Sequence, residues 1–287
     1  MNLPVSVSNS RKIALLIGIE YLGTENQLVG CTRDVINMYN VLVDTLGVLP
    51  SDIVMLTEQY GTLPTKRNIL YAIHELAKKS KDVNAQETII YYSGHGTQVP
   101  GYENDRKDEA LVPLDVNNGL ILDNTLRKYL DEMPNSTLCI TIFDCCNSAS
   151  IGDLPYHFKY NNYNKNCSCV KDIGSNYPNS TNSVFCISGC KDNGVSNVVK
   201  ENGVWESALT NAIIKIFKTR KETITYFQLI QYLTDYMTSE RLSQRPVLST
   251  SWSTSPGKLI TNKRDRPSVK NISSELQDEI AIISHLS

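Results

Sequence analysis

Short, β-branched apolar runs alternate with segments of helical periodicity along most of this 287-residue chain. The first run, KIALLIGI, is apolar throughout, which is typical of a strand that is buried on both faces of a sheet. Similar runs follow as DIVMLTE, ETIIYYS, TLCITIF and SVFCIS. Because helical segments separate them, the pattern predicts an α/β fold with a mainly parallel central sheet flanked by helices on both faces.

Five helices and one further strand are expected from periodicity and capping signals. Thr65 is suited to cap the second helix, and the RPVLSTS segment predicts a short edge strand because Pro246 is tolerated at an edge. The residues that mark the helices are Val35, Met38, Tyr39, Leu42 and Leu46, then Leu70, Ile73, Leu76 and Ala77, then Leu126 and Leu130, then Leu209 to Phe217, and finally Phe227, Ile230, Leu233 and Met237.

The chain is expected to form a single domain over residues 11–260, followed by a polar tail at 261–287. Within it, residues 161–182 are rich in Asn, Ser, Tyr and Lys without periodicity, which predicts a surface loop between segments 11–160 and 183–260.

Composition excludes several classes of function. The formal net charge of -2 offers no basic surplus for nucleic acid or anionic membranes. No apolar run is long enough to span a bilayer, and the polar start is unlike a secretory leader, so a cytoplasmic protein is expected. The eight cysteines are then expected to be reduced. Cys167, Cys169, Cys186 and Cys190 do not have the spacing of paired zinc ligands.

Polar residues follow three of the predicted strands, where ligands bind in open α/β sheets. Asp34 follows the first strand, His95 the third, and the DCCNSAS stretch at 144–150 the fourth. A nearby imidazole can accept the proton of a thiol and make it a nucleophile. The N–H groups of Gly96 and of the nucleophile itself are candidate donors to the oxyanion that forms on carbonyl attack.

Each residue also has a structural interpretation. A lone histidine at a strand end is often only a satisfied polar group, and buried cysteines are usually small apolar residues. The spacing favours catalysis, because His95 precedes Cys146 by 51 residues and caspases show a separation of about 50.

The segments ALLIGIEYLGTENQLVGCTRDV, YYSGHGTQ, DEALVPLD, IFDCC, DLPY and SGCKD together resemble the type I metacaspases in order, spacing and wording. The likeness runs from about Arg11 to about Ser251. It implies a caspase-like fold with large-subunit-like and small-subunit-like parts, and a monomeric cysteine endopeptidase that cuts after arginine or lysine.

By position, the resemblance assigns His95 as the catalytic histidine and Cys146 as the nucleophile, with Cys145 as the alternative thiol. Asp34 and Asp144 match the acids that recognise the basic side chain, and Ser93 is a third wall of that pocket. A carboxylate pair suits a guanidinium through charge-assisted hydrogen bonds. The alternative for Asp34 is a helix N-cap or a first-turn acid.

The resemblance further implies activation by calcium at Asp108, Asp123, Asn124 and Asp153, all of which offer the oxygen ligands that calcium prefers. Asn124 stands where relatives carry a second aspartate, which predicts a lower affinity. Alternatively, Asp123 or Asn124 caps the following helix.

Two departures beside the nucleophile leave the activity open. Asn147 and Ala149 replace the His and Gly of the His-Ser-Gly in relatives, with Ser148 unchanged, and alanine is strained if the glycine position needs a positive φ. These departures motivate a second hypothesis, a non-catalytic or weakly active scaffold or regulator of the same fold. A third, an unrelated Cys-His acyl transferase or amidase, explains neither set of acids.

Self-cleavage is a further expectation, because Lys159, Lys165 and Lys171 lie in or beside the polar loop, where a protease specific for basic residues can reach them.

Overall fold

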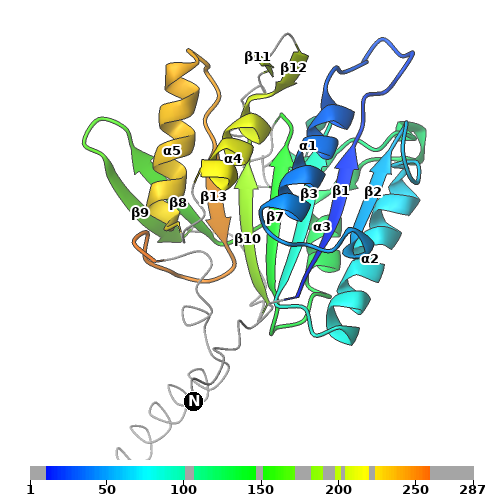
Figure 1. Ribbon diagram of the computed structural model, residues 1–287, viewed down its shortest axis with the longest axis horizontal. Coiled ribbons are helices and arrows are strands. Elements are labelled where there is room, and N and C mark those ends of the chain that lie inside the picture. Colours follow the sequence, from blue (N-terminus) through cyan, green and yellow to red (C-terminus); the bar gives the residue numbers. More distant parts are fainter. Residues whose placement is uncertain are drawn as a thin grey trace, which may run out of the picture.

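A computed structural model describes residues 11–100, 107–146, 151–171, 182–189, 198–201, 204–219 and 224–258. Its centre is an eight-stranded sheet in the order β2-β1-β3-β7-β10-β13-β8-β9 (Figure 1). The first five of these strands are parallel, and the last three join antiparallel. The prediction of a mainly parallel α/β sheet is therefore confirmed, with an antiparallel extension at one side.

The strands of the main sheet match the predicted apolar runs where the sheet is parallel. Their bounds are β1 Lys12–Gly18, β2 Ile53–Thr57, β3 Glu87–Ser93, β7 Leu138–Asp144, β10 Ser183–Ser188, β13 Val247–Thr250, β8 Tyr156–Asn161 and β9 Asn166–Lys171. Two smaller sheets stand at the carboxyl edge, built from β4 Gly96–Pro100, β5 Lys107–Leu111 and β6 Ile121–Leu122, and from β11 Val198–Glu201 and β12 Val204–Ser207.

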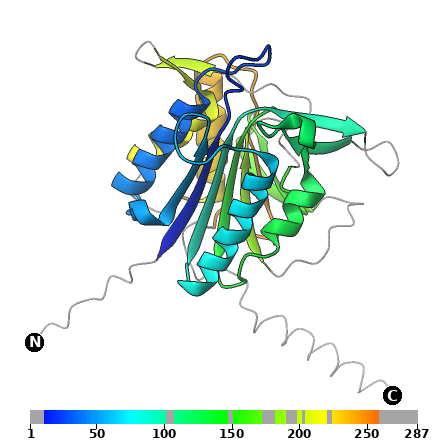
Figure 2. The same ribbon diagram turned by 90° about the vertical axis from the view of Figure 1, so that its right-hand side faces the viewer.

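Five helices of the described residues cover the two faces of the main sheet, as predicted. Helices α1, α4 and α5 lie on one face, and α2 and α3 on the other (Figure 2). Thr65 caps α2 as expected, because its side chain accepts the N–H of Asn68. The helices are α1 Cys31–Asp44, α2 Lys66–Asp82, α3 Asp123–Leu130, α4 Ala208–Thr219 and α5 Tyr226–Ser239.

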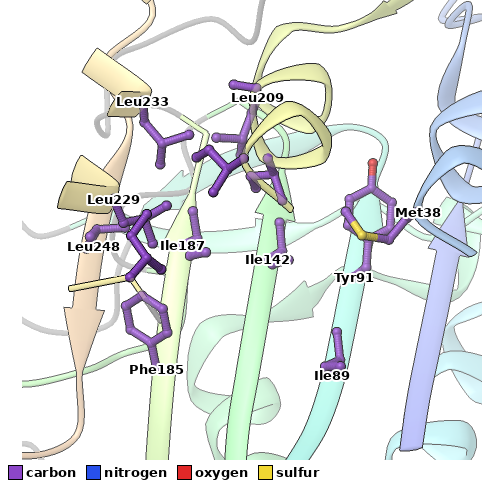
Figure 3. Close-up of a cluster of buried hydrophobic side chains, with 14 of the residues drawn as sticks. Met38, Ile89, Tyr91, Ile142, Phe185, Ile187, Leu209, Leu229, Leu233 and Leu248 are labelled. Carbon is purple, nitrogen blue, oxygen red and sulfur yellow. The ribbon is translucent and has the colours of Figure 1, made fainter. Parts of the chain in front are cut away.

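Apolar side chains from alternate positions of the strands fill a core on each face. On the α1, α4 and α5 face, Ile142 and Ile187 of the sheet lie opposite Leu209 and Leu233 of the helices (Figure 3). Removing water from this apolar surface, at roughly 25 cal/mol per Å², stabilises both layers and holds the strand ends in place.

Two sequence predictions for the antiparallel part are wrong. The segment 161–182 was expected to be a loop, but Asn166–Lys171 forms β9 and pairs with β8 as a hairpin. The strand predicted from RPVLSTS is not at an edge, since β13 lies between β10 and β8. Pro246 only precedes it, so no hydrogen bond of the ladder is lost.

The remaining predictions about the ends and the loop fall partly outside the described residues. These include the tail at 261–287, the stretch Asn147 to Ala149, and residues 172–181. No helix among the described residues combines the length and apolarity needed to cross a membrane.

Candidate active site

Three of the predicted pocket residues meet at the carboxyl edge of the sheet, at the top of Figure 1. Strands β3 and β7 place Ser93 beside Asp144 in register, because both strands are parallel neighbours. Asp34 comes from the first turn of α1, and the Ser93 hydroxyl donates to its Oδ2 at 3.2 Å. All three side chains are almost fully buried, with exposures of 2, 2 and 3 %. We call them the acid slot.

Residues at the start of α4 close this slot. The N–H of Ser207 donates to Asp34 Oδ1 at 3.1 Å. Thr210 donates to Asp144 Oδ2 through its N–H at 3.1 Å and its hydroxyl at 2.5 Å. Sequence reasoning missed both residues, although a Ser and a Thr at the start of an apolar helix are a recognisable signal for donors directed out of a helix N-terminus.

The electrostatics of the acid slot suit a cation. Burial raises the pKa of the Asp34 carboxyl well above its ordinary value, and the neighbouring charge of Asp144 raises it further. Neutral donors from Ser93, Ser207 and Thr210 do not cancel that charge. A guanidinium or ammonium group that enters the slot would relieve the repulsion between the two acids.

The alternative interpretation of Asp34 is only partly correct. Its position is that of a first-turn acid, but the N-cap of α1 is Gly30 and has no side-chain cap. The carboxylate is directed to Ser93 and Ser207 rather than to the amides of its own helix. The hydrogen bonds of Asp34 therefore join residues of the acid slot and do not cap helix α1.

His95 lies just beyond β3, half-buried, with its ring against Tyr21 at a centroid distance of 4.8 Å. Its Nε2 lies 2.8 Å from the carbonyl oxygen of Asn26. A carbonyl oxygen can only accept, so Nε2 carries the proton and Nδ1 has the lone pair in the neutral ring. This is the arrangement that a general base needs, with one nitrogen oriented by a hydrogen bond and the other able to take a proton.

The two adjacent cysteines have different surroundings. Cys145 is 1 % exposed and packs in the apolar core on the α2 and α3 face, whereas Cys146 is half-buried. Gly96 lies against Cys146, since a Cβ built on Gly96 would overlap the Cys146 carbonyl oxygen. The His95–Gly96 segment and the Cys146 segment are therefore neighbours. Nucleophilic attack on a substrate needs an accessible thiol, which favours Cys146 over Cys145.

The four predicted calcium ligands are only loosely assembled. Burial and the charges of Asp123 and Asp108 raise the pKa of Asp153 to about 6. Burial and the Asp108 charge raise the pKa of Asp123 as well. Asn124 is exposed. Such mutually repelling carboxylates have the chemistry of a calcium site. Within the described ranges, however, no three His, Cys, Asp or Glu side chains gather closely enough to hold a metal ion.

Neither Asp123 nor Asn124 is the N-cap of α3, because that position is Leu122. Asp123 instead accepts the N–H of Asn124 at 2.6 Å and that of Glu109 at 3.2 Å. The seven cysteines in the described part of the chain are present as thiols in the structure.

Comparisons with known proteins agree with this geometry. A family model described as "Metacaspase, peptidase C14 domain" matches residues 12–155. Metacaspase-1 of Candida glabrata is 30% identical over 294 residues, covering 86% of this chain and 74% of the relative. Metacaspase-1 of Candida albicans is also 30% identical, over 305 residues that cover 87% of this chain and 67% of the relative.

Solved structures show the same fold at low identity. Protein GSU0716 from Geobacter sulfurreducens aligns with a TM-score of 0.58 at 19% identity, covering 90% of this chain and 100% of that one. Caspase-1 from Spodoptera frugiperda aligns with a TM-score of 0.53 at 12% identity, covering 90% and 95%. The predicted caspase-like fold is thus confirmed.

Proposed function

Because the chain belongs to the metacaspase family of cysteine-type peptidases, we propose that it is a calcium-stimulated endopeptidase that cleaves after arginine or lysine, with Cys146 as nucleophile and His95 as base. The observation that carries the proposal is the acid slot. Two buried carboxylates, Asp34 and Asp144, share one end of the sheet with the accessible thiol. A basic side chain is the substrate group that neutralises such a slot.

The proposed reaction follows from the orientation of His95. Its Nδ1 accepts the proton of the Cys146 thiol, and the sulfur attacks the carbonyl carbon of the bond after the basic residue. The amides of Gly96 and Cys146 donate to the resulting oxyanion. When the intermediate collapses, His95 returns its proton to the leaving amine, and water then hydrolyses the thioester. The Asn26 carbonyl stabilises the ring while it is positively charged.

A purified sample should cleave an arginyl reporter peptide, and Cys146→Ala should abolish cleavage. Cys145→Ala is the matched control, because it removes the adjacent thiol from the apolar core and should retain activity. Cleavage that persists in Cys146→Ala and disappears in Cys145→Ala would reject the assigned nucleophile.

The same sample decides between an enzyme and a non-catalytic scaffold. An inhibitor that carries arginine and a thiol-reactive group should modify Cys146 if the site is competent. If Cys146 stays unmodified while the protein still binds arginyl peptides in the acid slot, the scaffold hypothesis replaces the peptidase.

Calcium is proposed as an activator and not as a catalytic group. Asp108, Asp123 and Asp153 would hold the ion, with Asn124 as a neutral ligand. The raised pKa values of Asp123 and Asp153 support this assignment, because a divalent cation removes the repulsion between their carboxylates. Binding requires the side chains to move closer together than they lie now. Calcium titration should raise the unfolding temperature of the wild type and leave that of Asp153→Ala unchanged.

Self-cleavage is proposed at Lys171 rather than at the two other candidate lysines. Lys165 lies in the turn between β8 and β9, where it pairs with Asp235 at 3.3 Å. Lys159 is within β8 and pairs in register with Ser168. Lys171 is exposed and forms the terminal pair of the β8–β9 ladder, with Tyr156, so its bond can reach an extended conformation when only the end of the ladder opens. Lys171→Gln should remove the fragment pair that mass spectrometry detects in the wild type.

We further propose a cytoplasmic monomer. The small net charge and the absence of a spanning helix among the described residues are compatible with that location. Cell fractionation and the elution volume in size-exclusion chromatography are the corresponding measurements.

A further inference from the structure

The segment between β1 and α1 contacts the His95 ring through two residues. Besides the Asn26 carbonyl, it contributes Tyr21, whose ring lies at 37° to the imidazole plane with the centroids 4.8 Å apart. Tyr21 is 6 % exposed, so neighbouring atoms hold its ring in place beside the imidazole. Two contacts from one short segment therefore restrict how the imidazole can rotate.

The hydroxyl of Tyr21 also binds the backbone of the catalytic segment. It accepts the N–H of His95 at 3.0 Å and donates to the carbonyl of Val112 at 2.6 Å. Tyr92 completes the arrangement by donating to the His95 carbonyl at 2.8 Å. Burial raises the pKa of both phenols well above the ordinary value, so both hydroxyls keep their protons.

Tyr21 holds an unfavourable backbone conformation in order to make these contacts. Its φ is 53°, in the left-handed region that non-glycine residues rarely adopt. The carboxylate of Glu58 supports this turn, because it accepts the N–H groups of Glu20, Tyr21 and Leu22 at 2.5, 2.8 and 2.8 Å. Three successive amides directed at one carboxylate form an anion-binding turn.

We propose that Tyr21, kept in its left-handed conformation by Glu58, is the positioning residue that aligns the His95 imidazole with the nucleophile. This inference rests on the proposed role of His95 as the base. It adds a residue that never touches the substrate but determines where the ring stands. The acid slot lies on separate side chains, so substrate affinity and ring alignment can be perturbed independently.

The test is Tyr21→Phe, which keeps the ring against His95 and removes only the hydroxyl. A displacement of the base on the order of 1 Å can lower the rate of the chemical step by roughly 100-fold. We expect kcat for an arginyl reporter to fall about 10- to 100-fold, with KM within about two-fold of the wild type. A KM increase without a change in kcat would overturn the proposal.

Tyr236→Phe is the matched control for simple loss of stability. It removes one phenol hydrogen bond, from Tyr236 to Asn211 Oδ1 at 2.8 Å, on helix α5. Both variants should unfold at slightly lower urea concentrations, but only Tyr21→Phe should lose kcat. Equal kcat in the two variants would mean that Tyr21 is merely structural.

Substitutions of Glu58 test the positioning role of Tyr21 independently. Glu58→Ala leaves three amides without their acceptor and should lower kcat as Tyr21→Phe does, while Glu58→Gln retains an acceptor oxygen and should restore part of it. If Tyr21→Phe does not fold, the Glu58 pair carries the test. An inactive wild type would refute the proposed function itself, whereas an active wild type with unchanged variants would refute only this inference.

Discussion

Gly96→Ala is the substitution whose effect follows most directly from the geometry. The added Cβ would overlap the Cys146 carbonyl oxygen, and it would lie 2.9 Å from the Cys145 Sγ and 3.3 Å from its Cβ. Favourable contacts between such atoms need about 3.5–4.0 Å. The backbone that carries the two cysteines, or the one that carries His95, must therefore move by roughly 1 Å or more.

That movement separates His95, the proposed base, from Cys146, the proposed nucleophile. A misplacement of this size can reduce turnover by roughly 100-fold. Overpacking a filled site destabilises a protein by typically 1–3 kcal/mol, which leaves most small domains folded. We therefore expect Gly96→Ala to be folded and nearly inactive, with the larger effect on kcat.

The assay compares kcat and KM for an arginyl reporter with the free energy of unfolding in urea. Gly257→Ala is the control glycine, because the nearest atom to its added Cβ is the Ser255 Oγ at 4.0 Å. If Gly96→Ala kept kcat within two-fold of the wild type at unchanged stability, the proposed need for a close approach of the His95–Gly96 and Cys146 segments would be refuted.

Three further predictions concern the acids. Asp144→Asn keeps the shape of the slot but removes one charge, so kcat/KM for an arginyl reporter should fall about 100-fold, which corresponds to about 3 kcal/mol. The kcat/KM for a citrulline reporter should change little, and Asp235→Asn on the surface is the control. Asp34→Asn should raise the free energy of unfolding at neutral pH, because folding raises the pKa of Asp34 and ionisation of its carboxyl then disfavours the folded state. In urea titrations, this gain in stability should vanish as the pH falls below the ordinary pKa of a carboxyl group. A chelator should slow the wild type, and the rate of Asp153→Ala should not respond to it.

The location of the acid slot could be predicted from the sequence because parallel strands end at one edge of the sheet. The apolar runs before Ser93 and Asp144 are long and β-branched, so their strands and their shared direction are well determined. Asp34 follows the neighbouring strand by way of the first turn of α1. Order along the chain thus brings all three residues to the same end.

The antiparallel part could not be predicted in the same way. Strand β9, with the sequence NCSCVK, lies at the open edge, and its side chains are only half-buried or exposed. Such a strand has no continuous apolar run to mark it. Ser207 and Thr210 were missed because their partners lie 173 and 66 residues away, and one sequence carries no sign of pairing at that distance.

The alternation of side chains along β7 explains why the two neighbouring cysteines differ. Phe143 and Cys145 point to the core on the α2 and α3 face, and Ile142 points to the opposite core. Asp144 therefore lies on the α1 and α4 face, where Thr210 binds it. A shift of one residue in the pairing of β7 would place the acid in an apolar core and Cys145 in the slot. The register of β7 with β3 thus places a charged residue, Asp144, in the slot. Cys145 then lies in the core, and the next residue, Cys146, carries the accessible sulfur.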